Sequence, residues 1–443
     1  MRFIKFPNSS PPQITSPLNS LHAKFLVSIL IRVAAALTAV ATNIVLARIL
    51  GVAQYGHYMT LYSTALILGS IAVLGTDQLL TREFSAGAAS ASDSRQQLIH
   101  WVAKRVAIGL VITTVSLITW NYFNETTPYI RHWPILGACI LLLALFALCT
   151  LLAATLNGFG ASQRSQLLTP LINNGSVLAL VLLTYLVSRA DITDGSVIWF
   201  QVCGYTAACA LGLYWLHRLQ TTSIPATPYA STATQTAKHW ASASRYFLFV
   251  ALTATAVNRL DVVLVSVIAG DATAGIYVAG ARLAQVALLV AVAVNTVLSP
   301  RLSAAWAARN RSQLTQLVRK ATVFTAAISL LEIIIALVFA PAITNILGPE
   351  YHTSADVFFA VVIAYALWTL AAPYFAFLNM TGSEKHLALL SALVAALNIT
   401  ALFLFVPIFG ARGAGIAMIV GYAAILPIVA VLVPKRLNAV KAY

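Results

Sequence analysis

The chain has 443 residues, of which 60% are hydrophobic and only 9% are charged, and its formal net charge is +15. This composition excludes an ordinary soluble domain and predicts a helical membrane protein with several spans. The apolar runs are too long and unbroken for the alternating strands of a β-barrel. The basic residues lie between the apolar runs, as membrane anchors do, so the charge predicts no nucleic-acid partner.

Helices are expected along nearly the whole chain, after a polar N-terminal tail at 1–22 that is rich in Pro and Ser. Allowing about 20–25 residues for each crossing, we predict an all-α polytopic membrane protein with about twelve transmembrane helices. The predicted limits are 24–50, 55–82, 98–122, 133–157, 164–188, 195–219, 241–269, 275–304, 315–341, 353–381, 384–408 and 411–433.

The distribution of basic residues predicts that both termini are cytoplasmic. With the N-terminus placed inside, only Arg131, Arg189 and Arg412 of the 27 Lys and Arg residues fall in outer loops, and four fall within spans. The remaining 20 lie on the inner side, which agrees with the positive-inside rule. The N-terminal tail and a second tail at 434–443 are therefore expected in the cytoplasm.

A polar stretch at 220–240 is predicted to be a cytoplasmic linker between two six-helix bundles, at 23–219 and 241–433. Six spans in each half leave both halves in the same orientation. This predicts a parallel repeat about an axis along the membrane normal.

Short internal matches support the repeat. GVAQYGHY from Gly51 and GDATAGIY from Gly270 share Gly, Ala, Gly and Tyr at one spacing. Further along the two halves, Gly204-Tyr205 is matched by Gly421-Tyr422 at a similar offset. Matches that recur in order at corresponding helix junctions are typical of an internal repeat.

Ionisable residues within the predicted spans are the candidate functional residues. Arg259 and Asp261, beside Asn258, lie just past the middle of an apolar stretch, where an ionised side chain costs about 2.5–3.5 kcal/mol. Side chains at i and i+2 of a helix point apart, so Asp261 does not simply neutralise Arg259. The other ionisable side chains within spans are Arg32, Arg48, Arg282 and Glu332.

Nothing in the sequence indicates catalysis. No acid pair, Ser/His/Asp set, metal cluster or phosphate-binding loop occurs at a useful spacing, and the loops are short. The cysteines all fall inside apolar runs and are predicted to be buried core residues, neither disulfides nor metal ligands: Cys139, Cys149, Cys203 and Cys209. We therefore predict a protein that is not an enzyme and holds no metal or cofactor.

Three segments resemble a known family: LARILGVAQYGHY from Leu46, LGTDQLLTREFSAG from Leu74, and NRLDVVLVSVIAGDATAGIYVAGARLAQ from Asn258. They are similar to the polysaccharide transporter family, the bacterial lipid-linked oligosaccharide or O-antigen flippases. This family belongs to the multidrug/oligosaccharidyl-lipid/polysaccharide exporter superfamily. The resemblance implies a V-shaped pair of bundles that alternates between inward- and outward-open states in the bacterial inner membrane. It also implies a cationic central cavity that moves an undecaprenyl-diphosphate-linked oligosaccharide from the cytoplasmic to the periplasmic leaflet.

An arginine-lined cavity suits such a substrate, because guanidinium groups stay charged and bind phosphate oxygens bidentately. The candidate substrate-binding residues are Arg32, Arg48, Arg259, Arg282 and Asn258. For Arg32, Arg48 and Arg282 the alternative is snorkelling to the membrane surface. Asp261 is expected to orient a cavity arginine, with proton transfer as the alternative. For Glu332 the alternatives are a protonated core residue, a hydrogen bond between helices, or a coupling-ion site.

The two halves are not symmetric in charge. Under the offset set by Gly51 and Gly270, Arg259 lies opposite Val40 and Asp261 opposite Thr42. The cavity charge is therefore predicted to come mainly from the second half, with Arg32 and Arg48 facing it from the first.

Two other functions are alternatives. The first is a cation-coupled multidrug exporter of the same superfamily, although a pocket for cationic drugs would favour carboxylates over arginines. The second is a non-transporting membrane scaffold of a polysaccharide assembly complex. For the flippase, the expected partners are the lipid-linked oligosaccharide and membrane lipids, and a polysaccharide polymerase and a chain-length regulator are candidate protein partners.

Overall fold

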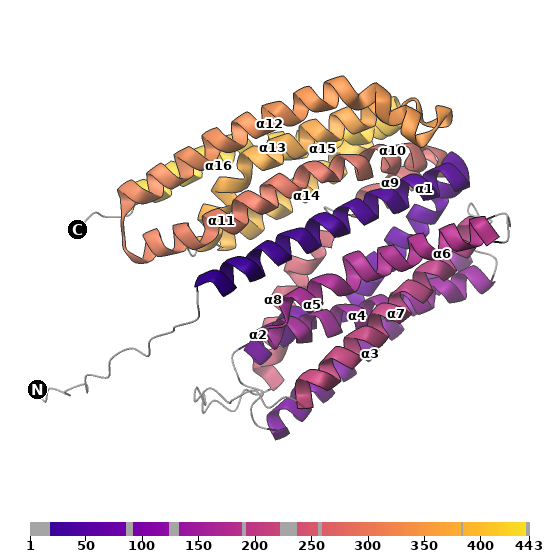
Figure 1. Ribbon diagram of the computed structural model, residues 1–443, viewed down its shortest axis with the longest axis horizontal. Helices are drawn as coiled ribbons and strands as arrows, with labels where there is room; N and C mark the ends of the chain where they lie inside the picture. Colours follow the sequence, from indigo (N-terminus) through magenta and orange to yellow (C-terminus); the bar gives the residue numbers. More distant parts are fainter. Residues whose placement is uncertain are drawn as a thin grey trace, which may run out of the picture.

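The computed structural model describes residues 18–85, 92–123, 133–187, 192–221, 237–255, 259–381 and 384–439. Within these ranges every regular element is a helix and there is no strand (Figure 1). The predicted class, an all-α polytopic membrane protein, is confirmed.

The helices of the first half are α1 (Leu18–Val73), α2 (Thr76–Ser85), α3 (Ser92–Phe123), α4 (Trp133–Gly158), α5 (Ser162–Leu167), the π-helical turn η1 (Leu168–Asn173), α6 (Asn174–Val187) and α7 (Asp194–Thr221). Those of the second half are α8 (Ala237–Thr255), α9 (Asp261–Ala269), α10 (Asp271–Ala284), the 3₁₀ turn η3 (Gln285–Ala287), α11 (Leu288–Ala307), α12 (Arg311–Leu347), the 3₁₀ turn η4 (Pro349–Tyr351), α13 (Ser354–Met380), α14 (Glu384–Phe409), α15 (Ala411–Ala423) and α16 (Ile425–Ala439).

Ten helices among the described residues are long and apolar enough to cross a membrane. The first of them, Val27–Val73, has 47 residues. At about 1.5 Å per residue it is roughly twice as long as a hydrocarbon core of about 30 Å. Gly51 interrupts it with a non-helical conformation (φ 69°, ψ 175°), so α1 contains two crossings. Together with α8 and α9, which occupy the seventh predicted span, these helices agree with the prediction of about twelve crossings.

The surfaces of the helices explain why they need a bilayer. Leu330, Leu331, Ile334 and Ile335 on α12 are all exposed. A water-soluble protein rarely leaves such a large contiguous apolar surface uncovered, whereas lipid acyl chains cover it without cost. The apolar composition of α12 therefore follows from its position facing lipid.

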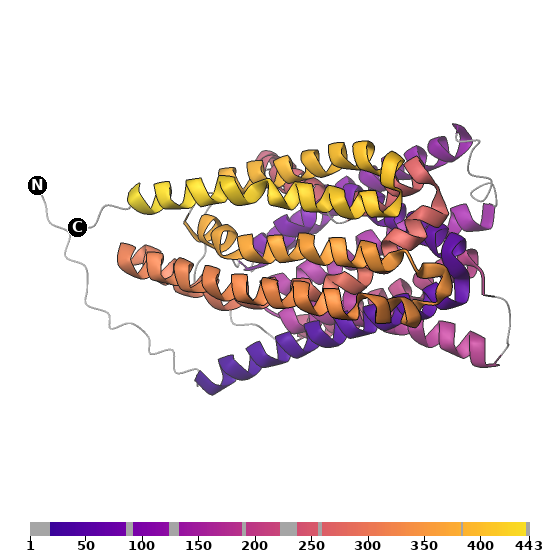
Figure 2. The same ribbon diagram turned by 90° about the horizontal axis from the view of Figure 1, so that it is seen from above.

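Figure 1 shows the helices gathered into two groups, with α2 to α7 in one and α10 to α16 in the other. The first crossing of α1 runs between them. The start of α1 and the end of α16 lie at one end of the molecule, here called the terminal end (Figure 2). The kink at Gly51 lies at the opposite end, the kink end. The division at 220–240 stays a prediction, since most of that stretch lies outside the described residues.

The matched segments of the internal repeat meet at the kink end. Gly51 (φ 69°) and Gly270 (φ 85°) share a left-handed backbone conformation that residues with a Cβ rarely adopt. Five residues later, Gly56 and Gly275 pack against each other's segments. A Cβ on Gly56 would lie 1.8 Å from the carbonyl oxygen of Asp271, and one on Gly275 would lie 2.1 Å from that of Val52. This reciprocal contact is the arrangement expected at the axis that relates two repeats.

We predict that Gly56→Ala and Gly275→Ala each lower the thermal stability of the purified protein, because the added methyl group would clash with backbone that has no freedom to move. Overpacking of this kind costs about 1–3 kcal/mol or more. The matched control is Gly137→Ala on α4, where a Cβ meets nothing within 4 Å. Unchanged melting temperatures for both junction variants would contradict the close packing described here.

Candidate functional site

A central cavity of about 490 Å³ lies between the two halves. The first half contributes side chains from α1, α4, η1, α6 and α7. The second half contributes Arg259, Arg282 and Gln285. None of the described residues that line the cavity is an aspartate or a glutamate. Among the described residues the walls therefore hold two permanent positive charges and no carboxylate, which favours an anionic ligand.

Arg259 lies just before α9 and reaches across the boundary between the halves. Its guanidinium carbon is 5.5 Å from the centroid of the Tyr62 ring on α1. A guanidinium above an aromatic face gains a cation–π interaction, which partly offsets the loss of water around the charge. An aromatic face is only a weak hydrogen-bond acceptor, so this contact leaves the N–H groups of the guanidinium available to a ligand. Arg259 is half-buried.

Arg282 lies in the last turn of α10, directly before the 3₁₀ turn η3. Along with Gln285 it lines both the central cavity and a small adjoining cavity of about 10 Å³. The small cavity also contains Asp261 and Tyr277. Arg282 therefore lies between the central cavity, which favours an anion, and the carboxylate of Asp261.

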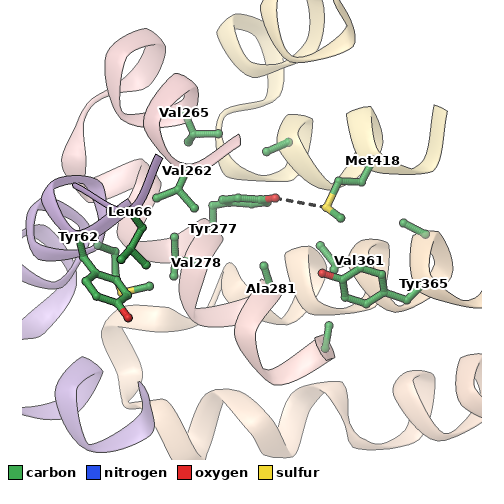
Figure 3. Close-up of a cluster of buried hydrophobic side chains, with 14 of the residues drawn as sticks. Tyr62, Leu66, Val262, Val265, Tyr277, Val278, Ala281, Val361, Tyr365 and Met418 are labelled. Carbon is green, nitrogen blue, oxygen red and sulfur yellow. Dashed lines mark hydrogen bonds between the residues drawn. The ribbon is translucent and has the colours of Figure 1, made fainter. Parts of the chain in front are cut away.

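Asp261 is bound by a tyrosine. Its Oδ2 atom accepts a hydrogen bond of 2.5 Å from the Tyr277 hydroxyl, while Oδ1 is buried with no hydrogen-bond partner in the described part of the chain. The same hydroxyl lies 3.2 Å from the Met418 sulfur (Figure 3). Because the hydroxyl has a single proton and a carboxylate is the stronger acceptor, the bond to Asp261 dominates. No ion pair joins Asp261 to an arginine among the described residues.

Arg48 is exposed at the kink end and does not line the central cavity. Its Nε donates to the carbonyl oxygen of Ile346 at 2.5 Å and its Nη2 to that of Asn345 at 3.1 Å. These carbonyls belong to the last turn of α12, where backbone acceptors lack helical partners and carry partial negative charge. Nearby, the Tyr351 hydroxyl donates to the carbonyl oxygen of Ala47 at 3.0 Å. Arg48 thus joins the two halves at their kink ends.

The remaining predicted residues are dispersed. Arg32 is exposed on α1 and is not among the residues that line the central cavity. Glu332 is half-buried on α12, and both of its carboxyl oxygens are buried without a hydrogen-bond partner within the described ranges. Asn258 lies outside the described residues. The structure thus brings Arg259 and Arg282 into one cavity and Asp261 into the adjoining one, and it leaves Arg32, Arg48 and Glu332 elsewhere.

Sequence reasoning from charge missed the uncharged polar residues of the cavity. These include Asn43, Asn173, Asn174 and Gln201, which lie within apolar spans. A carboxamide in a bilayer also needs hydrogen-bond partners, so amides within spans carry a signal of the same kind as arginines, although a weaker one.

The fold is that of a transporter of the multidrug/oligosaccharidyl-lipid/polysaccharide (MOP) superfamily. The chain is similar to the lipid II flippase MurJ in an inward closed conformation, with 14% identity over 90% of this chain and 87% of that one and a TM-score of 0.69. It is also similar to a multidrug resistance MATE family transporter of the MOP superfamily in an inward-facing conformation (14% identity, 92% and 95% covered, TM-score 0.68). A third similar structure is the Vibrio cholerae MATE transporter VcmN in the bent form (17% identity, 95% and 98% covered, TM-score 0.58).

The family is given by a separate comparison. The family described as polysaccharide biosynthesis protein matches residues 21–306, well over half of the chain. The chain belongs to this family, and the resemblance seen in the sequence is confirmed. No curated protein matches the chain.

The position of Arg48 generates a prediction about the kink end. Arg48→Ala should lengthen the distance between spin labels placed at Tyr185 on α6 and His352 after η4, measured by double electron–electron resonance. A hydrogen bond from a charged group at an exposed site contributes about 1 kcal/mol, which changes a two-state ratio about fivefold. The matched control is Arg412→Ala, because Arg412 pairs with Asp356 inside the second half at the same end, with Nη2 and Oδ2 2.5 Å apart. Identical distance distributions for Arg48→Ala and the parent protein would show that Arg48 does not hold the kink ends together.

Proposed function

We propose that the protein is a flippase that moves an undecaprenyl-diphosphate-linked oligosaccharide from the cytoplasmic to the periplasmic leaflet of the bacterial inner membrane, for the synthesis of a surface polysaccharide such as O-antigen. The observation that supports this most strongly is the central cavity, which is lined by Arg259 and Arg282 and by no carboxylate among the described residues. Membership of a polysaccharide biosynthesis family supports it independently.

The physical problem in flipping this lipid is its head group. A diphosphate is strongly solvated in water, and transfer of its charge through hydrocarbon without compensation is prohibitive. Two guanidinium groups replace part of that solvation with charge-assisted hydrogen bonds, and their planar shape suits phosphate oxygens. The polyprenyl tail needs no such help and can stay in the bilayer beside the protein.

Alternating access requires contacts that form in one state and break in the other. The bonds of Arg48 to the α12 carbonyls and of Tyr351 to Ala47 join the halves at the kink end. Under this proposal the terminal end is cytoplasmic, and the head group enters while the kink end is held closed. Release on the periplasmic side then requires these bonds to break and the Gly56–Gly275 packing at the same end to rearrange, which the two-bundle arrangement permits without unfolding any helix.

A multidrug exporter is the second candidate, because the fold is shared with MATE transporters and the buried Asp261 carboxyl lies beside the cavity. The charge of the cavity favours the flippase. At about 6 Å and an effective dielectric constant of about 20, each guanidinium repels a monovalent cation by about 3 kcal/mol. A cationic drug would meet two such charges before it reached Asp261. A scaffold without transport activity would need neither charge.

The test is export of surface polysaccharide in a host that lacks its own copy of the gene. Arg259→Ala should accumulate to normal levels and fail to support export, because losing a charge-assisted bidentate contact costs about 2–3 kcal/mol, or roughly 30- to 150-fold in affinity. Arg259→Lys should retain partial export, since the charge survives without the planar fork. Arg259→Glu should be the most severe.

The matched control is Arg319→Ala, which removes an exposed arginine of α12 outside the cavity and should leave export intact. Equal export by the Arg259→Lys and Arg259→Glu variants would mean that Arg259 does not bind phosphate. Normal export by all three Arg259 variants would favour the scaffold.

A further inference from the structure

The wall of the central cavity that faces the two arginines carries uncharged polar side chains. Asn173, Asn174 and Gln201 line it with the tyrosines Tyr58 and Tyr205, and all five belong to the first half. Four of the five are nearly fully buried: Asn173 is 1% exposed, Tyr58 2%, and Gln201 and Tyr205 3% each. A wall of this kind can form many hydrogen bonds and has no net charge.

Three of these side chains form a connected hydrogen-bond chain. The Asn173 Nδ2 donates to the Gln201 Oε1 at 2.9 Å, and the Gln201 Nε2 donates to the Tyr58 hydroxyl at 2.7 Å. The chain fixes the orientation of each amide. The Asn173 Oδ1 packs against Gly204 with no partner among the described residues, so the capacity that the chain leaves for a ligand is the second N–H of each amide.

A π-helical turn builds part of this wall. The segment η1 runs from Leu168 to Asn173 and includes Pro170. In an α-helix, neighbouring side chains diverge by about 100° around the axis, yet Asn173 and Asn174 both line the cavity. A π turn widens the helix at a cost in backbone hydrogen bonding and is frequent at functional sites. The segment therefore presents two successive amides to one space.

The second half shows that the fold itself does not require an amide at the position of Gln201. The offset that aligns Gly204-Tyr205 with Gly421-Tyr422 also aligns Gln201 with Met418. The two positions make equivalent contacts, since Gln201 bonds the hydroxyl of Tyr58 and Met418 lies against that of Tyr277 (Figure 3). A thioether thus fills in one half the position that an amide fills in the other. The amide is an addition specific to the wall that faces Arg259 and Arg282.

We propose that this wall is a carbohydrate subsite, which binds the first sugar ring of the substrate while the arginines bind the diphosphate; the inference rests on the proposed function. Sugar hydroxyls both donate and accept, and carboxamides and tyrosine hydroxyls match both roles. The cavity volume of about 490 Å³ lies within the range of small-molecule sites, roughly 300–1,000 Å³. The polarity of the two walls sets the orientation of the head group.

The test compares three lipids on the purified full-length protein in nanodiscs, with affinities measured by native mass spectrometry. The probes are undecaprenyl diphosphate, undecaprenyl-diphosphate-N-acetylglucosamine and undecaprenyl-diphosphate-galactose. The parent protein should bind at least one sugar-bearing lipid more tightly than undecaprenyl diphosphate. Gln201→Met, which copies the second half, should reduce that preference by about fivefold, as expected for a lost hydrogen bond. Asn174→Ala, at a half-buried position that tolerates truncation, should reduce it in the same direction.

The matched control is Asn398→Ala, a buried amide of α14 that does not line the cavity and should keep the full preference. Equal affinity of the parent protein for all three lipids, or an unchanged preference in both the Gln201→Met and Asn174→Ala variants, would overturn the carbohydrate subsite. Arg259→Ala should weaken binding of all three lipids. If Arg259→Ala leaves the binding of undecaprenyl diphosphate unchanged, the proposed flippase function fails. This result differs from the one that overturns the carbohydrate subsite, so the two failures are distinguishable.

Discussion

An arginine inside a bilayer is costly, and Arg259 and Arg282 line one cavity with no carboxylate among the described residues of its walls. The fold tolerates the pair in two ways. Tyr62 covers the face of the Arg259 guanidinium, and Asp261 lies in the adjoining small cavity with Arg282. Neither neutralises the charge within the central cavity itself. Under the proposed function an anion completes the cavity, and the position of the site in the membrane restricts that anion to one presented by a lipid or admitted from one side.

The scaffold around this site is close to symmetric, whereas the site is not. Gly51 and Gly270 share a backbone conformation, and Gly56 and Gly275 pack reciprocally where the two halves meet. At the cavity the halves diverge: one supplies both guanidinium groups and the amide of Gln285, and the other supplies the tyrosines and the other amides. A symmetric junction lets the two halves meet as similar bodies. An asymmetric cavity can bind two chemically different parts of one head group.

Much of the fold could be predicted from the sequence, because helices in a membrane must satisfy their own backbone and read as long apolar runs. The repeat was visible in its glycines, since the kink and the close contact between halves both exclude a Cβ. The site was only partly visible. Charge within the spans identified Arg259 and Arg282 as candidate cavity residues. The depth of an arginine within its span could not show that Arg48 lies outside the cavity, where it binds carbonyl oxygens at the end of α12. The placement of Asn173 beside Asn174 depends on η1, a helix irregularity that leaves no periodic signal in sequence, and Gln201 on α7 carries only the weak signal of an amide within a span.

The most direct measurement of the central claim is lipid translocation by the purified protein in liposomes. A fluorescent undecaprenyl-diphosphate-N-acetylglucosamine is incorporated into both leaflets, and dithionite, which does not cross the membrane, quenches the label that reaches the outer surface. In vesicles that contain the protein, dithionite should quench more of the lipid fluorescence than the fraction in the outer leaflet. The assay is run without a gradient, with a proton gradient and with a sodium gradient, and the excess is expected under at least one of these conditions. Quenching that stops at the level of protein-free vesicles under every gradient would contradict the account.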